Sequence, residues 1–290
     1  MYQRHFGFTV KPFAMTPDPA FLYASRRHAM AMTMLEYSLE SEAPFSVLTG
    51  EIGSGKTTLV RKLLRQLGEG VKVGLITHTH GRFQSIHGWV LAALGAIPGN
   101  ESDVGIYEAL VNLLKRQSAK GGRTLLVIDE AHNLPIEVLE ELRLLSNVNS
   151  ERDLLLQMLL VGQTELRVKL SRPELRQFAQ RVSVFYDLKR LDRDETHAYV
   201  QHRLKVAGGN PSLFHPDAID LVYTRTRGVP RLVNLICDFA LVYAFAERQV
   251  GVGAELVSRL VRDCAGCLAF PTSNAADAGV PVGITNSSAA

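Results

Sequence analysis

Cysteine is scarce in this chain of 290 residues, which contains three in all. So few cysteines exclude a disulfide framework. Cys264 and Cys267 form a lone CxxC with Cys237 upstream, and no second pair of ligands stands nearby at metal-binding spacing. We therefore expect incidental thiols in a reducing compartment rather than a metal or redox centre.

A secretory leader and long apolar runs are missing as well. Arg4 and His5 are not followed by an apolar stretch, and no run of about 18 apolar residues occurs anywhere. The most apolar segment, Leu232 to Phe245, is interrupted by Asn234 and Asp238, which predicts a buried helix. We expect a cytoplasmic protein that would be peripheral at the inner membrane only through a partner.

Neither sign of charge dominates, because 32 basic residues face 29 acidic ones and the net charge is +3. This balance does not identify a nucleic-acid binder, although it leaves room for a local basic patch. A hydrophobic content of 46% at this length predicts an ordinary globular core in one domain with a smaller second one.

Strand and helix patterns alternate through the first two thirds of the chain, which predicts a doubly wound parallel sheet. The expected strands cover residues 45–49, 71–77, 124–128, 154–161 and 182–188. The expected helices cover residues 25–40, 56–67, 83–94, 105–119, 135–146, 165–170 and 173–180. The fold class is then α/β.

Four segments follow from this pattern. Residues 1–44 would be an N-terminal segment packing on the core, and residues 45–191 would be the α/β core domain, to which the motifs below assign nucleotide binding. Helical patterns at 192–206, 217–226, 230–248 and 254–264 predict an all-α lid over residues 192–267. The small, polar residues 268–290 predict a disordered tail.

A phosphate-binding loop carries the strongest signal. The segment between strand 45–49 and helix 56–67 matches GxxxxGK(S/T), in which glycines turn backbone N–H groups toward phosphate oxygens. Lys56 would supply charge to the β- and γ-phosphates, and the Thr57 hydroxyl would ligate Mg²⁺. The ATP-binding residues expected here are Gly50, Glu51, Ile52, Gly53, Ser54, Gly55, Lys56, Thr57 and Thr58.

A carboxylate pair ends the third predicted strand. Asp129 follows four aliphatic residues and would hold Mg²⁺ through water beside the phosphate loop. Glu130 comes next and would polarise the attacking water. A solvated loop acid is the competing interpretation of Glu130.

Three further polar residues complete the predicted ATPase site. Gln163 ends the fourth strand and would face the γ-phosphate or the attacking water. Arg231 begins a lid helix and would reach the γ-phosphate from a mobile lid. Arg181 would act in a neighbouring subunit's site as an arginine finger, with Arg176 as the alternative and a plain surface charge as the competing interpretation.

These motifs together resemble AAA+ ATPases, and the N-terminal block narrows the resemblance to the ExeA-like (general secretion pathway protein A) family. The block consists of Phe6-Gly-Phe8, Lys11-Pro-Phe13, residues 16–23, Ser25 and His28. The phrases at 48–58, 129–134, 161–166, 175–182 and 228–234 resemble the same family. The resemblance implies a P-loop NTPase core of the AAA+ type with three layers and a helical lid. It also implies Gln163 as sensor 1, Arg231 as sensor 2, and a role in assembling bacterial secretion, pilus or exopolysaccharide machines.

Two departures limit what the resemblance implies. Secretion members usually continue into a membrane span and a peptidoglycan-binding domain, so we do not expect direct cell-wall binding by this chain. The second strand ends in Thr77-His-Thr-His80, where many relatives would have an asparagine near the nucleotide.

The sequence leaves three functions open. The favoured one is an ATPase that forms a homo-oligomeric ring and remodels an envelope complex with a protein partner. The second is a DNA-associated regulator of the transposition type, because relatives of the same core serve transposition. Its basic clusters would be Arg225, Arg227 and Arg231, and Arg61, Lys62 and Arg65. The third, a non-catalytic ATP-dependent scaffold, is disfavoured by the intact Asp129-Glu130 pair.

Overall fold

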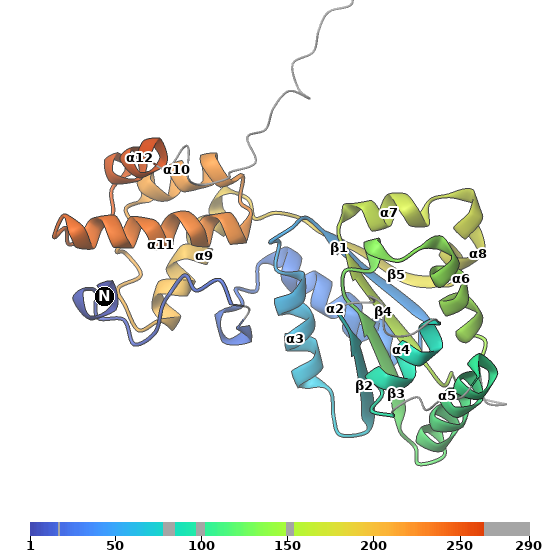
Figure 1. Ribbon diagram of the computed structural model, residues 1–290. Helices are drawn as coiled ribbons and strands as arrows, with labels where there is room; N and C mark the ends of the chain where they lie inside the picture. Colours follow the sequence, from blue (N-terminus) through green and yellow to red (C-terminus); the bar gives the residue numbers. More distant parts are fainter. Residues whose placement is uncertain (17, 78–84, 97–101, 149–153, 264–290) are drawn as a thin grey trace, which may run out of the picture.

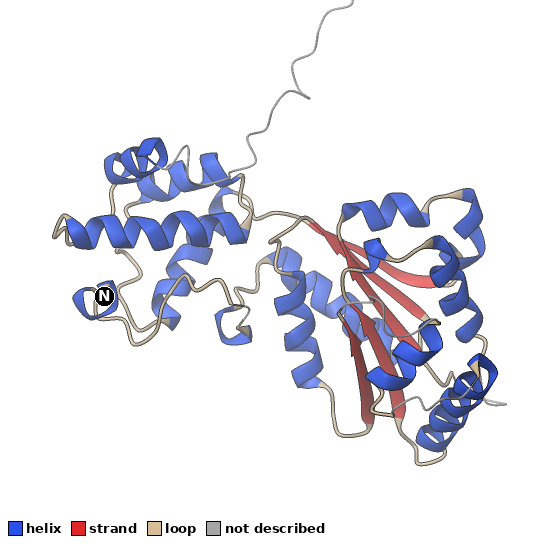
Figure 2. Cartoon of the chain, viewed as in Figure 1, coloured by secondary structure: helices blue, strands red, loops and turns tan. Residues whose placement is uncertain are grey.

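The computed structural model describes residues 1–16, 18–77, 85–96, 102–148 and 154–263. It shows an α/β core on one side and a bundle of helices on the other (Figure 1). All strands of the described chain lie in the core, as the colouring by secondary structure in Figure 2 makes plain.

The core contains one parallel five-stranded sheet with the order β2-β3-β4-β1-β5. The strands are β1 (Phe45–Gly50), β2 (Val71–Ile76), β3 (Arg123–Ile128), β4 (Gln157–Gly162) and β5 (Val182–Leu188). This architecture confirms the predicted fold class. The sheet is parallel, so the carboxyl ends of β1, β3 and β4 lie at one edge, where ligands bind in open α/β sheets.

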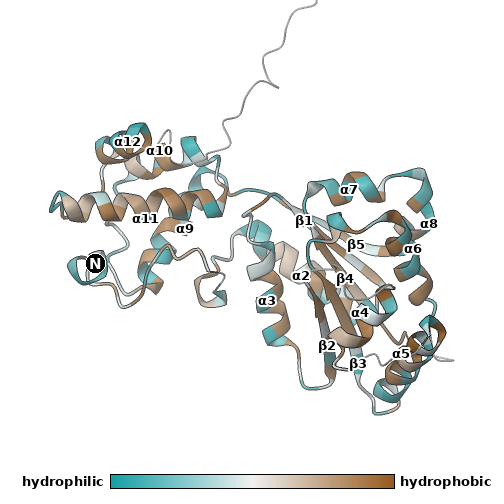
Figure 3. Ribbon diagram, in the orientation of Figure 1, coloured by the Kyte–Doolittle hydropathy of each residue, from teal (hydrophilic) through white to brown (hydrophobic). Residues whose placement is uncertain are grey.

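The central strands are the most deeply buried. Every residue of β1 and β4 is buried, whereas the edge strand β2 is largely half-exposed. Strands covered on both faces read as near-continuous aliphatic runs, which is why β3 and β4 were recognisable in the sequence. Figure 3 shows hydrophobic residues along these strands and a mixture of hydrophobic and hydrophilic residues along the surrounding helices.

Helices cover both faces of the sheet and complete three layers. One face packs against α2 (Arg26–Glu40) and α3 (Lys56–Gln66). The other face is covered by a larger set. That set is α4 (Ile86–Ala93), α5 (Asp103–Ser118), α6 (Ile136–Leu145), α7 (Thr164–Leu170) and α8 (Arg176–Ala179).

The lid is the all-α domain that the sequence predicts. It consists of α9 (Arg193–Val206), α10 (Pro216–Thr226), α11 (Pro230–Ala246) and α12 (Ala254–Asp263). The apolar segment at 232–245 lies within α11, which buries one face in the core of the lid. Its other face exposes Phe239 and Val242, so the prediction of a buried helix holds for one face only. None of the helices in the described part of the chain is both long and apolar enough to cross a membrane.

The N-terminal segment corrects one expectation. Residues 1–44 were expected to pack on the ATPase core, and their second half does so through α2. The aromatic side chains of their first half belong instead to the hydrophobic core of the lid. Those side chains are Tyr2, Phe8, Phe13 and Phe21. Phe13 meets Phe214 edge-on at 5.8 Å, and Tyr2 donates a hydrogen bond to Asp238 of α11. Apolar rings need a large apolar surface, and here the lid helices provide it.

Two short connections join the lid to the core. One runs from the short helix η1 (Pro19–Phe21) into α2, and the other runs from β5 into α9. Side chains tie the two connections together, because Arg27 donates a hydrogen bond to the carbonyl of Arg190 and lies 4.0 Å from the Asp192 carboxylate. Tyr186 Oη also donates to the Arg27 carbonyl at 3.0 Å.

Several expected boundaries shift. The fourth strand begins at Gln157 rather than at residue 154, because pairing with β3 begins at that residue. The helix expected over 173–180 is divided into η3 (Pro173–Leu175) and α8. The tail at 268–290, the CxxC and residues 78–84 lie outside the described residues.

Candidate active site

A glycine-rich loop connects β1 to α3 at the carboxyl edge of the sheet. Gly53 and Gly55 have positive φ values of 79° and 100°, a conformation that favours glycine. A Cβ atom at Gly53 would lie 2.5 Å from Cβ of Arg231, so a side chain there would collide with the lid. The loop geometry expected for a phosphate cradle is therefore present.

Lys56 lies buried at the start of α3. Its Nζ donates hydrogen bonds to the carbonyls of Gly50 and Glu51 at 2.7 and 2.9 Å. Burial lowers the pKa of Lys56, while the nearby Glu130 and Asp129 carboxylates oppose this shift. Ser54 Oγ is also buried and has no hydrogen-bond partner within the described residues. A buried cation beside an unsatisfied hydroxyl fits a site that receives an oxyanion.

Thr57 and Asp129 bring two oxygen atoms together beside this loop. Thr57 Oγ1 lies 3.3 Å from Asp129 Oδ2, although the two residues come from α3 and from the end of β3. Hydroxyl and carboxylate oxygens are the ligands that Mg²⁺ prefers. The pair predicted to hold Mg²⁺ from sequence therefore lies within reach of one ion.

Glu130, Gln163 and His132 form a cluster at the ends of β3 and β4. Glu130 has a left-handed backbone with φ 53°, and its Oε2 lies 3.4 Å from His132 Nδ1. The side-chain amide nitrogen of Gln163 lies 3.0 Å from His132 Nε2. Sequence reasoning gave His132 no role, although it stands inside the quoted phrase 129–134 and could have been singled out there.

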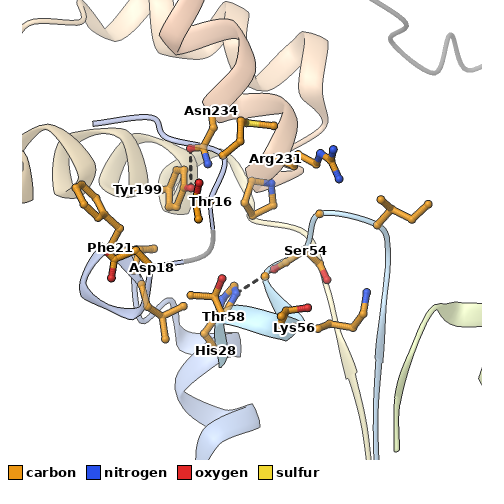
Figure 4. Close-up of a pocket in the computed structure, with 18 of the residues that line it drawn as sticks. Thr16, Asp18, Phe21, His28, Ser54, Lys56, Thr58, Tyr199, Arg231 and Asn234 are labelled. Carbon is orange, nitrogen blue, oxygen red and sulfur yellow. Dashed lines mark hydrogen bonds between the residues drawn. The ribbon is translucent and has the colours of Figure 1, made fainter. Parts of the chain in front are cut away.

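A cavity of about 580 Å³ extends from the phosphate loop to the lid. Figure 4 shows Thr16, Asp18 and Phe21 of the N-terminal segment on its lid side, with Tyr199 and Asn234 nearby. Pockets of this size accommodate small-molecule ligands. The sequence analysis named none of these five residues as site residues.

Arg203 ties the N-terminal segment to the lid at this cavity. Its guanidinium donates to the carbonyls of Pro12 and Ala14 at 2.6 and 3.2 Å and to Tyr199 Oη at 3.0 Å. It also stacks on the Phe21 ring at 4.7 Å, and only 7% of the residue is exposed. The charge is thus satisfied by carbonyls and aromatic faces.

His28 supports the phosphate loop from behind. Its Nε2 lies 3.2 Å from the Ser54 carbonyl and its Nδ1 lies 2.9 Å from Ser25 Oγ. A carbonyl only accepts, so Nε2 carries the proton and Nδ1 accepts from the serine hydroxyl. Burial lowers the pKa of His28, against the opposing effects of the Ser54 hydrogen bond and Glu195. The signal for this role was the Ser25-x-x-His28 pair in the N-terminal block.

Arg231 joins the lid directly to the loop. Its backbone N–H donates to the Gly53 carbonyl at 3.2 Å, while its side chain is exposed at the start of α11 (Figure 4). The guanidinium forms no hydrogen bond or ion pair with the described residues. Of the other loop residues, Glu51 pairs with Arg190 at 2.7 Å and Ile52 is 61% exposed.

Arg181 lies away from this site. It precedes β5, whose first residue Val182 pairs with Phe45 at the amino edge of the sheet, opposite the phosphate loop. Its Nη1 donates to Ser146 Oγ at 2.7 Å, so the half-buried side chain is bonded within its own domain. Arg176, the alternative, is exposed on α8.

Comparisons with known proteins agree with this geometry. Residues 39–170 match the model of a family described as AAA domain. The chain is 39% identical over 253 residues to general secretion pathway protein A of Aeromonas hydrophila, covering 85% of this chain and 45% of that protein. The chain thus spans about half the length of this relative.

Solved structures share the fold at low identity. The ORC2 protein of Aeropyrum pernix, in ADPNP and ADP complexes, has a TM-score of 0.66 and 18% identity, over 88% of this chain and 72% of that one. Cdc6p of Pyrobaculum aerophilum has a TM-score of 0.62 and 18% identity, over 86% of this chain and 71% of that one. At such identities the likeness concerns the fold alone.

Proposed function

Since this chain belongs to the ExeA-like AAA+ ATPases, we propose that it binds ATP with Mg²⁺ and hydrolyses it to ADP and phosphate. The observation that supports this proposal is the meeting of Lys56, Asp129, Glu130 and Gln163 in one cavity. Phosphoryl transfer requires a protein mainly to position the reacting groups and to stabilise the charge of the transition state, and these residues can do both.

Each residue would have a separate task. Lys56 would exchange its two carbonyl partners for the β- and γ-phosphates. Thr57 and Asp129 would hold Mg²⁺, which neutralises phosphate charge when bound. Glu130 would polarise the attacking water, and Gln163 would contact the γ-phosphate.

The biological process that we propose is assembly or remodelling of a bacterial envelope complex, with the ATPase acting as a homo-oligomeric ring on a protein partner. The name of the Aeromonas hydrophila relative supports a connection to secretion. Ring formation is supported by the position of Arg181 beside Val182, at the edge of the sheet opposite the phosphate loop.

A regulator bound to DNA is the second candidate. Arg225 and Arg227 are exposed beside the turn before α11, and their guanidinium groups form no ion pair with the described residues. Filter binding to duplex DNA over a salt series separates the candidates, because phosphate contacts make affinity fall steeply with salt. Salt-dependent binding that is lost in Arg225→Ala/Arg227→Ala would favour the DNA role.

Two variants test the ATPase itself. Lys56→Ala should abolish tight ATP binding, because the γ-phosphate loses its cationic partner. Glu130→Gln should bind ATP normally and release phosphate about 100-fold more slowly, as expected on removing a general base. Affinity for a fluorescent ATP analogue and phosphate release are measured for both. Hydrolysis by Glu130→Gln at the normal rate would contradict the assignment of Glu130.

A further inference from the structure

His132 lies between the residue proposed to polarise water and the residue proposed to contact the γ-phosphate. Its Nδ1 is 3.4 Å from Glu130 Oε2 and also 3.4 Å from the backbone nitrogen of Gln163. Its Nε2 is 3.0 Å from the Gln163 side-chain amide. The imidazole therefore has contacts with both residues, and 13% of its side chain is exposed.

Nδ1 cannot satisfy both of its neighbours at once. The Glu130 carboxylate only accepts hydrogen bonds, so it requires a proton on Nδ1, whereas the Gln163 backbone N–H requires a lone pair there. A neutral imidazole has one proton and one lone pair. The tautomer with the proton on Nδ1 can therefore bond only Glu130 at this atom, and the tautomer with the proton on Nε2 can bond only the Gln163 backbone N–H there.

The choice at Nδ1 also sets the orientation of the Gln163 amide. With the proton on Nδ1, Nε2 is an acceptor and the amide must present its NH₂ group to the ring. With the proton on Nε2, the amide must present its oxygen, and its NH₂ group turns away from the ring. Gln163 lines the cavity, so that NH₂ group becomes available to a phosphate oxygen.

The surrounding backbone holds this ring in a fixed place. Lys169 Nζ donates to the carbonyls of His132 and Leu134 at 2.5 and 2.7 Å, which fastens the turn after Glu130 to α7. A Cβ atom at Gly162 would lie 3.2 Å from the His132 backbone nitrogen, so β4 approaches this turn closely. A fixed ring can change its hydrogen bonds by moving a proton more readily than by moving itself.

We propose that His132 is a positioning residue whose tautomer links γ-phosphate contact at Gln163 to release of the Glu130 carboxylate. Without a γ-phosphate, the proton would lie on Nδ1 and face the Glu130 carboxylate, whose Oε2 is 3.4 Å away. When Gln163 turns its NH₂ group to the γ-phosphate, its oxygen accepts from Nε2–H. The Nδ1 proton leaves to solvent and another arrives at Nε2, so the ring stays neutral. Glu130 is then free to polarise water. This inference rests on the proposed ATPase function.

The tautomer can be measured without any hydrolysis. Protein with ¹⁵N-labelled histidine is compared by NMR in three states: free, with ADP, and with a non-hydrolysable ATP analogue plus Mg²⁺. The His132 signal is assigned by its loss in His132→Asn. We expect Nδ1–H in the free and ADP states and Nε2–H with the analogue. Because no hydrolysis is needed, failure of this prediction is distinct from failure of the ATPase activity.

Two variants complete the NMR experiment. Gln163→Ala should retain Nδ1–H with the analogue bound, because nothing then demands the proton at Nε2. Asn133→Ala alters an exposed residue of the same turn and should leave the tautomer change intact. One tautomer in all three wild-type states, or a change that persists in Gln163→Ala, would overturn the proposal.

Hydrolysis provides an independent readout in a double-mutant cycle. Gln163→Ala should lower kcat about 10-fold in the wild-type background but less than about threefold in His132→Phe, where Glu130 is never held. His132→Asn keeps an amide at the Nδ1 position, which can still hold Glu130, but loses the contact to Gln163, so this variant should hydrolyse ATP slowly. His132→Phe cannot hold Glu130 and should not hydrolyse ATP slowly. Affinity for the ATP analogue should stay within about twofold of wild type in His132→Asn and in His132→Phe. Equal kcat losses for Gln163→Ala in both backgrounds, or a parallel loss of ATP affinity in the two His132 variants, would show a merely structural histidine.

Discussion

The two ends of the cavity are built in opposite ways. The phosphate end comes from residues 50–58 and from the ends of β3 and β4, so most of it is contiguous in sequence. The lid end brings Thr16 and Phe21 together with Tyr199 and Asn234, which are more than 170 residues away in the chain. The first end combines the backbone of a glycine-rich loop with side chains that follow β3 and β4, whereas the second end consists of side chains from distant parts of the chain.

This difference teaches what each end can tolerate. A loop that binds through backbone N–H groups depends on a few glycines and on the support of His28. A side-chain network such as Arg203, Tyr199 and Asn234 depends on every member, because each loss leaves buried polar groups unpaired.

The largest effect should come from outside the chain's own cavity. If Arg181 acts on a neighbour, Arg181→Ala should bind ATP normally and hydrolyse it about 1,000-fold more slowly, because an arginine finger stabilises only the transition state. Specific activity should also rise with protein concentration. Steady-state hydrolysis over a dilution series, with the exposed Arg176→Ala as the matched variant, measures both effects.

Mixing decides whether this arginine acts in trans. Arg181→Ala has an intact phosphate loop, and Lys56→Ala has an intact Arg181, so mixed rings should regain part of the activity. If ATPase activity does not recover in demonstrably mixed oligomers, Arg181 is a structural residue that acts through its hydrogen bond to Ser146. A loss in Arg176→Ala in place of Arg181→Ala would identify the exposed alternative.

Arg203→Met should separate the two ends of the cavity. The change leaves the carbonyls of Pro12 and Ala14 without their donor, so the free energy of unfolding should fall by about 2–4 kcal/mol. Affinity for ATP should fall while affinity for inorganic tripolyphosphate stays unchanged, because only the lid end is altered. Urea denaturation and calorimetric titration measure these quantities. Arg225→Met, at an exposed position, is the control and should change the unfolding free energy by less than about 0.5 kcal/mol.

The smallest effect should appear as a pH dependence of stability through His28. Burial lowers the pKa of His28 in the folded protein, so the unfolded chain binds this proton more tightly. The neutral His28 side chain contributes to the free energy of unfolding in full above about pH 6.5, the pKa of histidine in the unfolded chain. This contribution is lost as the pH falls through the lower pKa that His28 has in the folded protein. Urea midpoints between pH 7.5 and 5 should therefore fall less steeply in His28→Gln. If the urea midpoint depends on pH equally in the wild type and in His28→Gln, His28 is not a buried neutral side chain. His87→Gln serves as a comparison, because burial also lowers the pKa of His87.

The sequence was sufficient for the phosphate end for a physical reason. A loop flanked by its own strand and helix is determined locally, so Lys56 and Thr57 could be placed from spacing alone. Asp129 and Glu130 followed because a buried strand must end at the sheet edge. The site residues assigned from these motifs remain proposals for experiment, but their positions agree with one another in space.

The lid end was not predictable for an equally physical reason. The local pattern around Phe13 does not predict that its partner is Phe214. Burial of an aromatic ring requires apolar surroundings, but it does not determine which residues of the chain provide them. The same applies to Arg203, whose donors are satisfied by carbonyls about 190 residues earlier. His132 was present in a recognised phrase, but its two-sided contact depends on the approach of β4, which spacing along the chain does not reveal.

The paired connections between lid and core have a mechanical consequence. If the lid rotates, the two short connecting segments, fastened to each other through Arg27, Arg190 and Asp192, would form its axis. The helix α1 (Tyr2–His5) is anchored to α11 by Tyr2 and Asp238. A pull on α1 would then turn the lid and displace Arg231, whose backbone contacts the Gly53 carbonyl.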